Sequence, residues 1–334
     1  MNYYYYIRPM NQRFINPFIG VMIVIFILTI VHLMVDNPIL LAERFFPHFG
    51  GWIEILLIAF YAGFIIDRMT QGRNISYWRG FTWTLFTIVF FSQLFLGLLG
   101  FERFLMTGTL HLPVPALIIG GSLYKLKIGF MPILFLSTII ISGPAWCSQL
   151  CYFGAIDLQV SKAGKKPKKL KYKTALKMTF LLLVIAGALI LRFFNFDYQV
   201  SAWFGGAFGI AGIGIIILIS RKKRMMYHCT VYCPIGTVTQ YLKFINPFRM
   251  YIEQAACTLC MHCKPHCKYD ALHTSDNKNG KPGLSCTYCG DCVSSCDTDA
   301  IKYKLFNLRD QRAQNAWIII SISLHAFFLA LGRI

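Results

Sequence analysis

Long apolar stretches separated by short polar segments run along most of the chain, and this pattern predicts membrane helices. A helix needs roughly 20 mostly apolar residues to cross a hydrocarbon core of about 30 Å. The second and seventh stretches are short, and the seventh is either a span or an interfacial helix. The stretches cover residues 14–35, 51–66, 81–99, 128–146, 174–193, 202–220 and 317–331. We therefore predict an α-helical integral membrane protein with about seven spans.

One further apolar segment, near residues 109–124, lies between the third and fourth stretches. It contains Pro113, Pro115, Gly120 and Gly121, which disfavour a regular helix. A full crossing here would move every later lysine-rich loop to the outer side, against the usual charge pattern of membrane proteins. We expect a re-entrant or surface-lying piece at the outer face.

Composition supports membrane insertion, and the charge distribution orients the chain. Of the 334 residues, 56% are hydrophobic and only 14% are charged, which is too apolar for a soluble protein of this size. If the amino terminus is inside, the inner segments and Lys177 carry +18 of the formal +19, the segments being 1–13, 67–80, 147–173 and 221–316. Because Lys and Arg collect in cytoplasmic loops, we predict a multi-pass protein of the bacterial inner membrane. The first stretch is long enough to span, so no cleaved signal peptide is expected.

Two cysteine runs in the carboxyl-terminal third carry the most specific motif. Each reads C-x2-C-x2-C-x3-C, the spacing by which bacterial ferredoxins hold two 4Fe–4S clusters, with the fourth cysteine of each run binding the other cluster. This rule assigns Cys257, Cys260, Cys263 and Cys296 to cluster one, and Cys286, Cys289, Cys292 and Cys267 to cluster two. Zinc sites are usually built from two separated C-x2-C pairs, and disulfides are rare in the cytosol. Iron–sulfur clusters are therefore the preferred interpretation.

The two runs are copies of one unit. The tripeptide at residues 270–272 recurs as a similar tripeptide at 299–301, at the same offset of 29 residues that relates the cysteines. We predict an inserted α+β unit like a two-cluster bacterial ferredoxin at residues 251–304, on the cytoplasmic side. The proline that usually follows the fourth cysteine is replaced by Lys268 and Asp297. That change bears on potential and stability rather than on ligand identity.

A second cysteine pattern lies at the inner ends of two predicted helices. Each copy reads C-x3-C-x2-G, and the copies align at an offset of 82 residues, Cys147, Cys151 and Gly154 with Cys229, Cys233 and Gly236. Each pair supplies two thiolates, which are too few for a cubane or a closed zinc site, whereas four suffice. The pattern predicts that the two helix ends meet and share one iron–sulfur or other metal site. Two separate thiol couples, redox-active or structural, are the alternative.

These motifs divide the chain into segments. Residues 1–146 form membrane helices, 147–173 a cytoplasmic loop with the first C-x3-C pair, 174–220 a helical hairpin, 221–250 the second pair and a connector, 251–304 the ferredoxin-like unit, and 305–334 a linker and terminal helix.

Taken in order over residues 108–304, the motifs resemble the NapH/NosR-type membrane polyferredoxins. The resemblance implies quinone-linked electron supply to extracytoplasmic reductases. Tyr152 stands where the family has proline in the first loop, whereas Pro234 matches in the second. The flavin-binding domain of NosR has no expected counterpart ahead of the first span. The chain is also similar to the ferredoxin-like membrane proteins of cytochrome oxidase copper assembly, without the extracytoplasmic domain that follows their last span.

We therefore expect an electron-transfer subunit that relays electrons between the quinone pool and a respiratory, extracytoplasmic reductase system. As an enzyme it would be a quinol-linked oxidoreductase. The alternative is an iron–sulfur-dependent copper reductase or assembly factor that uses the C-x3-C pairs, although the outer loops lack the Met- or His-rich tracts that copper delivery favours. Expected partners are membrane lipid, quinone or quinol, and a cytochrome, ferredoxin or reductase subunit. Nucleic acid is not expected, because the lysine run at 162–173 suits lipid headgroups.

No cysteine is predicted near the outer face, so a quinone or a partner's cofactor must bridge the membrane. Titratable groups at membrane depth are functional candidates by default. The candidates for a quinone site near the outer boundary are His32, Asp36, Glu43, His48, Glu54, Glu102 and His111. His32 and His325 are also conceivable haem ligands on two helices.

Overall fold

The structure, a computed structural model, describes residues 10–35, 37–71, 74–105, 112–163, 170 and 172–331, with only the backbone for 10–13. Asp36 and His111, two of the quinone-site candidates, lie outside these residues. Six described helices are long and apolar enough to cross a membrane. They make the chain a multi-pass membrane protein.

The six long helices correspond to six of the seven predicted stretches. They are α1 (Met10–Met34), α3 (Gly50–Gln71), α4 (Ile75–Leu98), α8 (Lys173–Phe193), α9 (Tyr198–Ile215), which continues through the π-helical turn η3 (Ile216–Ser220) into α10 (Arg221–Lys223), and α13 (Asp310–Leu331). The second and seventh stretches are longer as helices than their apolar parts predicted. Polar residues at one end of each continue the helix, because hydropathy marks the lipid-facing length and not the helix boundary.

The fourth predicted stretch is a shorter helix than expected. Helix α6 (Phe130–Ser142) has 13 residues and ends at Gly143, whose φ of 62° only glycine adopts readily, followed by Pro144. At 1.5 Å per residue it is about 20 Å long and falls short of the hydrocarbon core. The preceding helix α5 (Leu117–Lys125) is shorter still. A re-entrant or surface-lying position for the segment near 109–124, of which 109–111 lie outside the described residues, stays a prediction.

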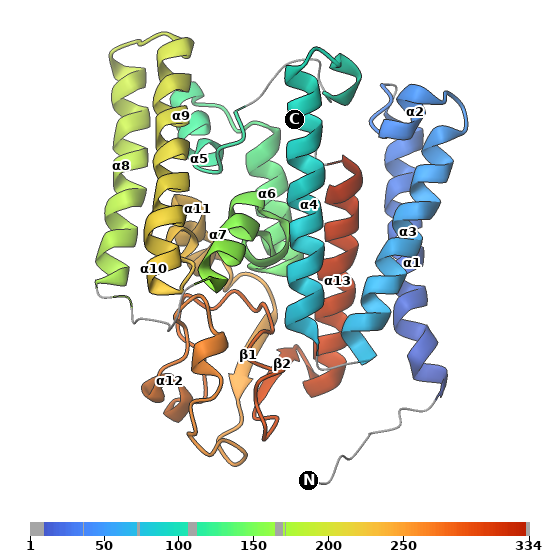
Figure 1. The fold of residues 1–334 in the computed structure, drawn as a ribbon, viewed down its shortest axis with the longest axis vertical. Helices are drawn as coiled ribbons and strands as arrows, with labels where there is room; N and C mark the ends of the chain where they lie inside the picture. Colours follow the sequence, from blue (N-terminus) through green and yellow to red (C-terminus); the bar gives the residue numbers. More distant parts are fainter. Residues whose placement is uncertain are drawn as a thin grey trace.

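The helices form two outer pairs around a central group (Figure 1). Helices α8 and α9 stand at one side, α1 and α3 at the other, and α4, α6 and α13 lie between them. The terminal helix α13 packs against α1, α3 and α6, and 56% of its membrane window is buried inside the protein. The last helix is therefore a central packing element and not a peripheral anchor.

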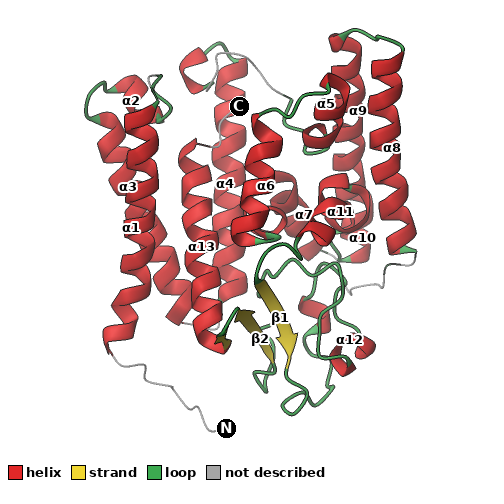
Figure 2. Cartoon of the chain, turned by 180° about the vertical axis from the view of Figure 1, so that it is seen from behind, coloured by secondary structure: helices red, strands yellow, loops and turns green. Residues whose placement is uncertain are grey.

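The cysteine-rich unit lies below the helical body, at the end where α3, α9 and α10 finish and α4, α8 and α13 begin (Figures 1 and 2). Its sheet pairs β1 (Phe248–Ile252) antiparallel with β2 (Ile301–Leu305), which pairs with β3 (Leu308–Arg309). A short helix, α12 (Thr274–Lys278), lies between the two cysteine runs. The sheet begins three residues before the predicted boundary at 251 and extends beyond the boundary at 304.

Aromatic packing attaches this unit to the helical body. Trp317 of α13 is 2% exposed, and its ring contacts Phe248, Tyr288 and Tyr303 at centroid distances of 5.3, 5.9 and 6.1 Å. Such contacts bury large apolar areas and fix ring orientation. The sheet and the second cysteine run are thus held against the first turns of α13.

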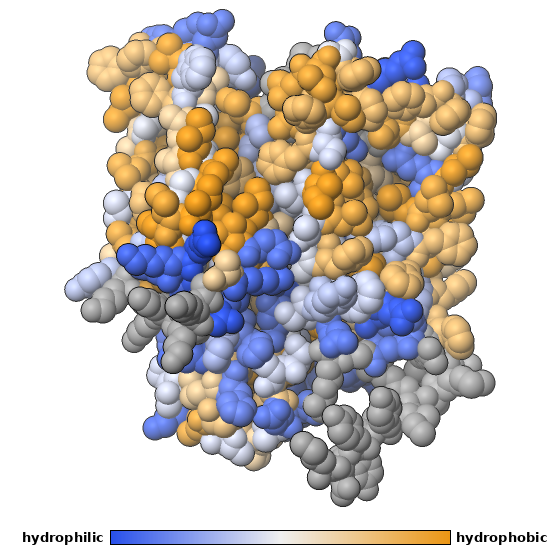
Figure 3. Space-filling model, viewed as in Figure 1, coloured by the Kyte–Doolittle hydropathy of each residue, from blue (hydrophilic) through white to orange (hydrophobic). Residues whose placement is uncertain are grey.

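The surface of the molecule separates by hydropathy (Figure 3). Hydrophobic side chains cover the helical body, and hydrophilic side chains gather over the cysteine-rich unit. Large apolar side chains on the helices, including Phe26, Phe60 and Trp203, are among the most exposed. An exposed apolar belt of this extent requires lipid around it.

Candidate iron–sulfur centres

The backbone of the two cysteine runs repeats as closely as their sequence. Residues with positive φ occur at three pairs of positions 29 residues apart, Leu259 and Tyr288, Met261 and Gly290, and Asp270 and Asp299. The Ala271 N–H donates to Cys267 Sγ at 3.2 Å, and the equivalent Ala300 N–H donates to Cys296 Sγ at 3.3 Å. Because a backbone N–H stabilises negative charge on sulfur, both copies are built to hold thiolates.

The structure brings the fourth cysteine of each run to the other run. Burial raises the pKa of Cys292, and the neighbouring Cys289, Cys267 and Cys286 raise it further. Burial likewise raises the pKa of Cys263, to which Cys296 and Cys260 contribute. Sulfurs that interact in this way are spatial neighbours, so Cys267 lies with Cys286, Cys289 and Cys292, and Cys296 lies with Cys260 and Cys263. The assignment of each set of four cysteines to one cluster stays a prediction.

The two groups differ in exposure. In the first, Cys260 is exposed, and the backbone N–H of His262 helps to lower its pKa. In the second, Cys267 and Cys292 are buried, and burial raises the pKa of Cys267 to about 12. A thiol with that pKa is protonated at neutral pH, so metal binding there must displace a proton. The first group faces solution and the second faces the helical body.

The donors of both groups are cysteine thiols. All twelve cysteines of the chain are free, and a 4Fe–4S cluster is bound by four cysteine thiolates.

The two C-x3-C pairs share one local fold. Cys147 lies in the π-helical turn η2 (Trp146–Leu150) and Cys229 in η4 (His228–Tyr232). Cys151 and Cys233 then take extended backbone conformations and cap helices α7 (Tyr152–Lys162) and α11 (Pro234–Leu242). π-Helical turns are rare and are found mostly at functional sites. The repeat at offset 82 is therefore structural as well as sequential.

Helix amino termini face the second cysteine of each pair. Burial raises the pKa of Cys233, while the N–H groups of Gly236 and Ile235 act in the opposite direction. Gly154 and Phe153 do the same for Cys151. The partial positive charge of a helix amino terminus stabilises a thiolate or an anionic cluster.

The two pairs meet in the fold. Cys147 is 8% and Cys233 is 9% exposed, and they belong to one apolar cluster with Cys151 packed against it. Burial raises the pKa of Cys229, and Asp157, Cys151, Cys233 and Cys147 add to the effect. A small cavity of about 10 Å³ is lined by Cys147 and Cys229 together with Cys286 of the second group. The four thiols thus form a third group, adjacent to the second.

Several residues that surround this third group were not singled out from the sequence. Asp157 accepts a hydrogen bond from the Cys229 N–H at 3.0 Å, and Trp83 Nε1 donates to the Cys151 carbonyl at 2.7 Å. Lys177 lines the cavity and donates to Gln240 Oε1 at 2.5 Å. The sequence could have marked Lys177, because a lysine inside an apolar stretch is unusual. No sequence feature marks Asp157 or Trp83.

Adding a methyl group at Gly236 should damage the third group selectively. A Cβ there would lie 2.5 Å from the Cys229 carbonyl oxygen, and one at Gly154 would lie 2.3 Å from the Trp83 ring. Overpacking of this kind costs about 1–3 kcal/mol and displaces Cys233 through the start of α11. We expect Gly236→Ala to lower the iron content while the spectrum of the ferredoxin-like unit persists.

Gly214→Ala is the matched control, because a Cβ at that position meets no atom within 4 Å. Iron analysis and electron paramagnetic resonance of both variants measure the difference. A Gly236→Ala protein with the iron content of the wild type would contradict this prediction.

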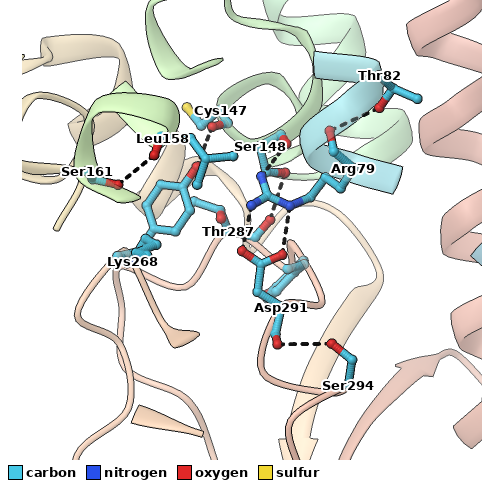
Figure 4. A network of polar contacts seen from close by, with 12 residues as sticks. Arg79, Thr82, Cys147, Ser148, Leu158, Ser161, Lys268, Thr287, Asp291 and Ser294 are labelled. Atoms are coloured by element: carbon cyan, nitrogen blue, oxygen red, sulfur yellow. Dashed lines mark hydrogen bonds and ion pairs between the residues drawn. The ribbon is translucent and has the colours of Figure 1, made fainter. Parts of the chain in front are cut away.

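A buried polar network joins the second and third groups (Figure 4). Arg79 of α4 is 0% exposed, and its Nε and Nη2 donate to the Asp291 carboxylate at 2.9 and 2.5 Å. Its Nη1 donates to the Ser148 carbonyl at 3.1 Å. Asp291 lies between Cys289 and Cys292, and Ser148 lies between Cys147 and Cys151. One guanidinium therefore contacts the ligand loops of both groups.

Two further hydrogen bonds connect the second cysteine run and the residues next to it with the first C-x3-C segment. Tyr269 OH donates to the Cys147 carbonyl at 2.7 Å, and Ser148 Oγ donates to the Thr287 carbonyl at 3.2 Å. Lys243, at the end of α11, donates to the carbonyl oxygens of Leu284 and Cys286. The loop from Leu284 to Asp291 is thereby fixed to the first C-x3-C segment and to the end of α11.

The outer quinone-site candidates mostly hold local structure. Glu43 of α2 (Leu41–Phe45) accepts the N–H groups of His48 and Gly51, and Glu54 accepts the N–H of Ala42. The His32 ring packs edge-on against Trp52 at 5.1 Å. Glu102 begins the short 3-10 helix η1 (Glu102–Phe104). These contacts give Glu43, Glu54 and His32 structural roles, and a quinone site among the candidates stays a prediction.

His325 lies deep in the protein and contacts the third group indirectly. Its Nε2 is 3.0 Å from Tyr61 OH, and its Nδ1 is 3.3 Å from the carbonyl oxygen of Gln149, within the first C-x3-C segment. Both ring nitrogens therefore have protein partners, which leaves neither directed at a haem iron. The haem interpretation of His32 and His325 gains no support.

Comparison with known proteins finds one matching family and two relatives. A family described as a 4Fe–4S binding domain (Fer4_5) matches residues 128–171 and 204–248, and each part contains one C-x3-C pair. An uncharacterized protein of Methanocaldococcus jannaschii is 21% identical over 172 residues, covering 50% of this chain and 66% of that protein. NADH-quinone oxidoreductase subunit I 2 of Aquifex aeolicus is 31% identical over 81 residues, covering 20% of this chain and 39% of that protein.

The chain thus spans less than two thirds of the length of the curated relatives it matches. No solved structure matches it significantly. Two segments of the chain thus match a 4Fe–4S binding domain, one around each C-x3-C pair.

Proposed function

We propose that the protein relays electrons through three 4Fe–4S centres between the cytoplasmic face of the bacterial inner membrane and the quinone pool, in service of an extracytoplasmic reductase. Cys257, Cys260, Cys263 and Cys296 hold the first centre, Cys267, Cys286, Cys289 and Cys292 the second, and Cys147, Cys151, Cys229 and Cys233 the third. The clusters supply one-electron chemistry when bound. The protein residues set their order, spacing and surroundings.

The observation that carries this proposal is the arrangement of the three groups, from an exposed ligand in the first to a cavity that the second and third share. The first group has an exposed ligand, the second is buried against the helical body, and the third lines a cavity shared with Cys286 of the second. Such an order connects solution to the membrane in short steps. A catalytic centre would instead need an accessible pocket with convergent acid–base groups.

Residues around the third group prepare it for an anionic centre. Helix amino termini face Cys151 and Cys233, and Lys177 places a buried cation in the same cavity. Buried charge is tolerated when it is paired, and a cluster with four thiolates provides the opposite charge. The same end of the helical body carries the Lys- and Arg-rich segments, which supports a cytoplasmic orientation.

Oxidation by a quinone tests this function. Protein is purified without oxygen and fully reduced, and a soluble quinone analogue is then added. We expect the clusters to be reoxidised, with recovery of the iron–sulfur absorption as the readout. The quinol form of the same analogue, added at equal concentration, is the control, because it cannot accept electrons from the clusters. Reduced clusters that persist in excess quinone would contradict the proposed function, and tight copper binding at the third group alongside that result would favour metal handling.

A further inference from the structure

One copy of the repeated unit is docked inside the chain, and the other presents the same face to solution. In the second run, Gly290 packs so closely on α4 that a Cβ would lie 3.2 Å from Ile75 Cγ2, and Asp291 pairs with Arg79. The equivalent residues of the first run, 29 positions earlier, are Met261 and His262. The same loop that binds α4 in one copy is thus free for an external partner in the other.

A groove follows this free loop. It is lined by Met261, His262, Pro265 and His266 of the first run, Ser294 and Ser295 of the second, Asn74, Ser76 and Tyr77 at the start of α4, and Lys162 at the end of α7. Met261 and His262 lie directly between the ligands Cys260 and Cys263. A molecule seated here would contact the loop that carries the exposed ligand of the first centre.

The charge of this face is inverted relative to its docked counterpart. The internal face offers a carboxylate, Asp291, to a cation. At the equivalent position the free face has His262, and at two others Lys264 and His266 replace Val293 and Ser295. None of the described residues that line the groove is acidic. One carboxylate of the described residues pairs with this face: Asp297 lies 3.1 Å from His262 Nδ1 and is 75% exposed.

Lys162 adds a cation with long reach. It is exposed at the end of α7, and it is the first of seven lysines between residues 162 and 173. A positive surface raises the association rate of a negatively charged partner. Because transient redox complexes are small and polar, a groove of this kind suits a soluble electron carrier.

We propose that this groove docks a small acidic ferredoxin, which exchanges one electron with the first centre. The proposal rests on the proposed function and adds the cytoplasmic partner and its docking face. No bond is made or broken in the exchange. One electron leaves the reduced ferredoxin cluster, and one centre of the protein is reduced.

Stopped-flow mixing of the full cluster-loaded chain with a pre-reduced acidic [2Fe–2S] ferredoxin tests the docking face. We expect a second-order rate constant that falls as salt rises, because screening weakens charge attraction. The double variant Lys162→Glu/His266→Glu should lower the low-salt rate constant by about tenfold or more and flatten its salt dependence. Lys162→Arg should keep the wild-type rate.

Lys281→Glu is the matched control, since Lys281 is exposed on the same unit but outside the groove, and we expect its rate to equal that of the wild type. Iron content and reduction by dithionite establish that each variant is loaded. A double variant with the wild-type rate and salt dependence would overturn the proposal. So would phosphatidylglycerol vesicles that bind the wild type and not the double variant while the two ferredoxin rates are equal, because the groove would then be a headgroup site.

The quinone experiment separates this proposal from the function on which it rests. Wild-type protein that accepts electrons from ferredoxin but never passes them to quinone would refute the quinone relay and leave the docking face intact. Wild-type protein that exchanges electrons with quinone but shows no salt-dependent reaction with ferredoxin would refute the docking face alone.

Discussion

Replacing Arg79 by Met is expected to loosen the cysteine-rich unit from the helical body. The guanidinium is 0% exposed and the Asp291 side chain is 5% exposed, so the variant leaves a buried carboxylate without its cation. Removing one partner of a buried ion pair costs about 3–5 kcal/mol. The Ser148 carbonyl loses a donor at the same time. Denaturant unfolding, followed by iron–sulfur absorption and by the fluorescence of Trp317 and the other tryptophans, measures the loss.

Substitutions at the same pair separate charge from geometry. Arg79→Lys keeps the charge but cannot form two parallel bonds to Asp291, so it should recover only part of the stability. Arg79→Met/Asp291→Leu removes both charges and should be more stable than Arg79→Met alone. Arg68→Met, at an exposed position of α3, is the control and should change stability by no more than about 0.5 kcal/mol. An Arg79→Met protein as stable as this control would refute the assigned role of the pair.

The role of Arg79 could not be read from the sequence. It lies in the second turn of α4, directly after a polar connection, and a linear count of charges assigns it to an inner loop. Its partner Asp291 is 212 positions away. Hydropathy and charge counting use neighbours along the chain, so they detect that a cation is near a membrane boundary but not that a distant segment folds over it.

The cysteine groups, in contrast, were accessible to sequence reasoning because their spacing is set by chemistry. Ligands of one cluster must come from a short loop and a distant fourth residue, and the two offsets of 29 and 82 residues appear in the backbone as repeated positive φ angles and repeated π-helical turns. A repeat in the sequence therefore predicts a repeat in the backbone, because the same local sequence favours the same local conformation in each copy.

Helix α13 shows a second limit of the sequence. Its apolar part predicted a short span that could have been interfacial, yet the helix begins at Asp310 and lies in the centre of the bundle. Lipid tails are as apolar as leucine side chains, so the sequence does not distinguish a helix that faces lipid from one that faces other helices. The contact of Trp317 with the sheet depends on the same long-range packing.

Serine substitution of either C-x3-C pair is expected to remove one whole cluster. Three 4Fe–4S centres correspond to about twelve iron atoms per chain and two to about eight. Cys229→Ser/Cys233→Ser leaves only Cys147 and Cys151, and two thiolates cannot hold a cubane. The converse variant, Cys147→Ser/Cys151→Ser, should lose the same iron. Iron and acid-labile sulfide analysis, with electron paramagnetic resonance of the reduced protein, gives the count.

Combining the two double variants tests whether the pairs share one site. If all four thiols hold a single cluster, the quadruple variant loses no more iron than either double variant, because residues that act as a unit give non-additive effects. Two independent metal sites would instead lose iron in two steps. Cys260→Ser is the control for position, since that exposed ligand belongs to the first centre and its loss should leave the signal of the third centre unchanged. A wild type with only about eight iron atoms, unchanged by either double variant, would show that the pairs hold no cluster and act as thiols.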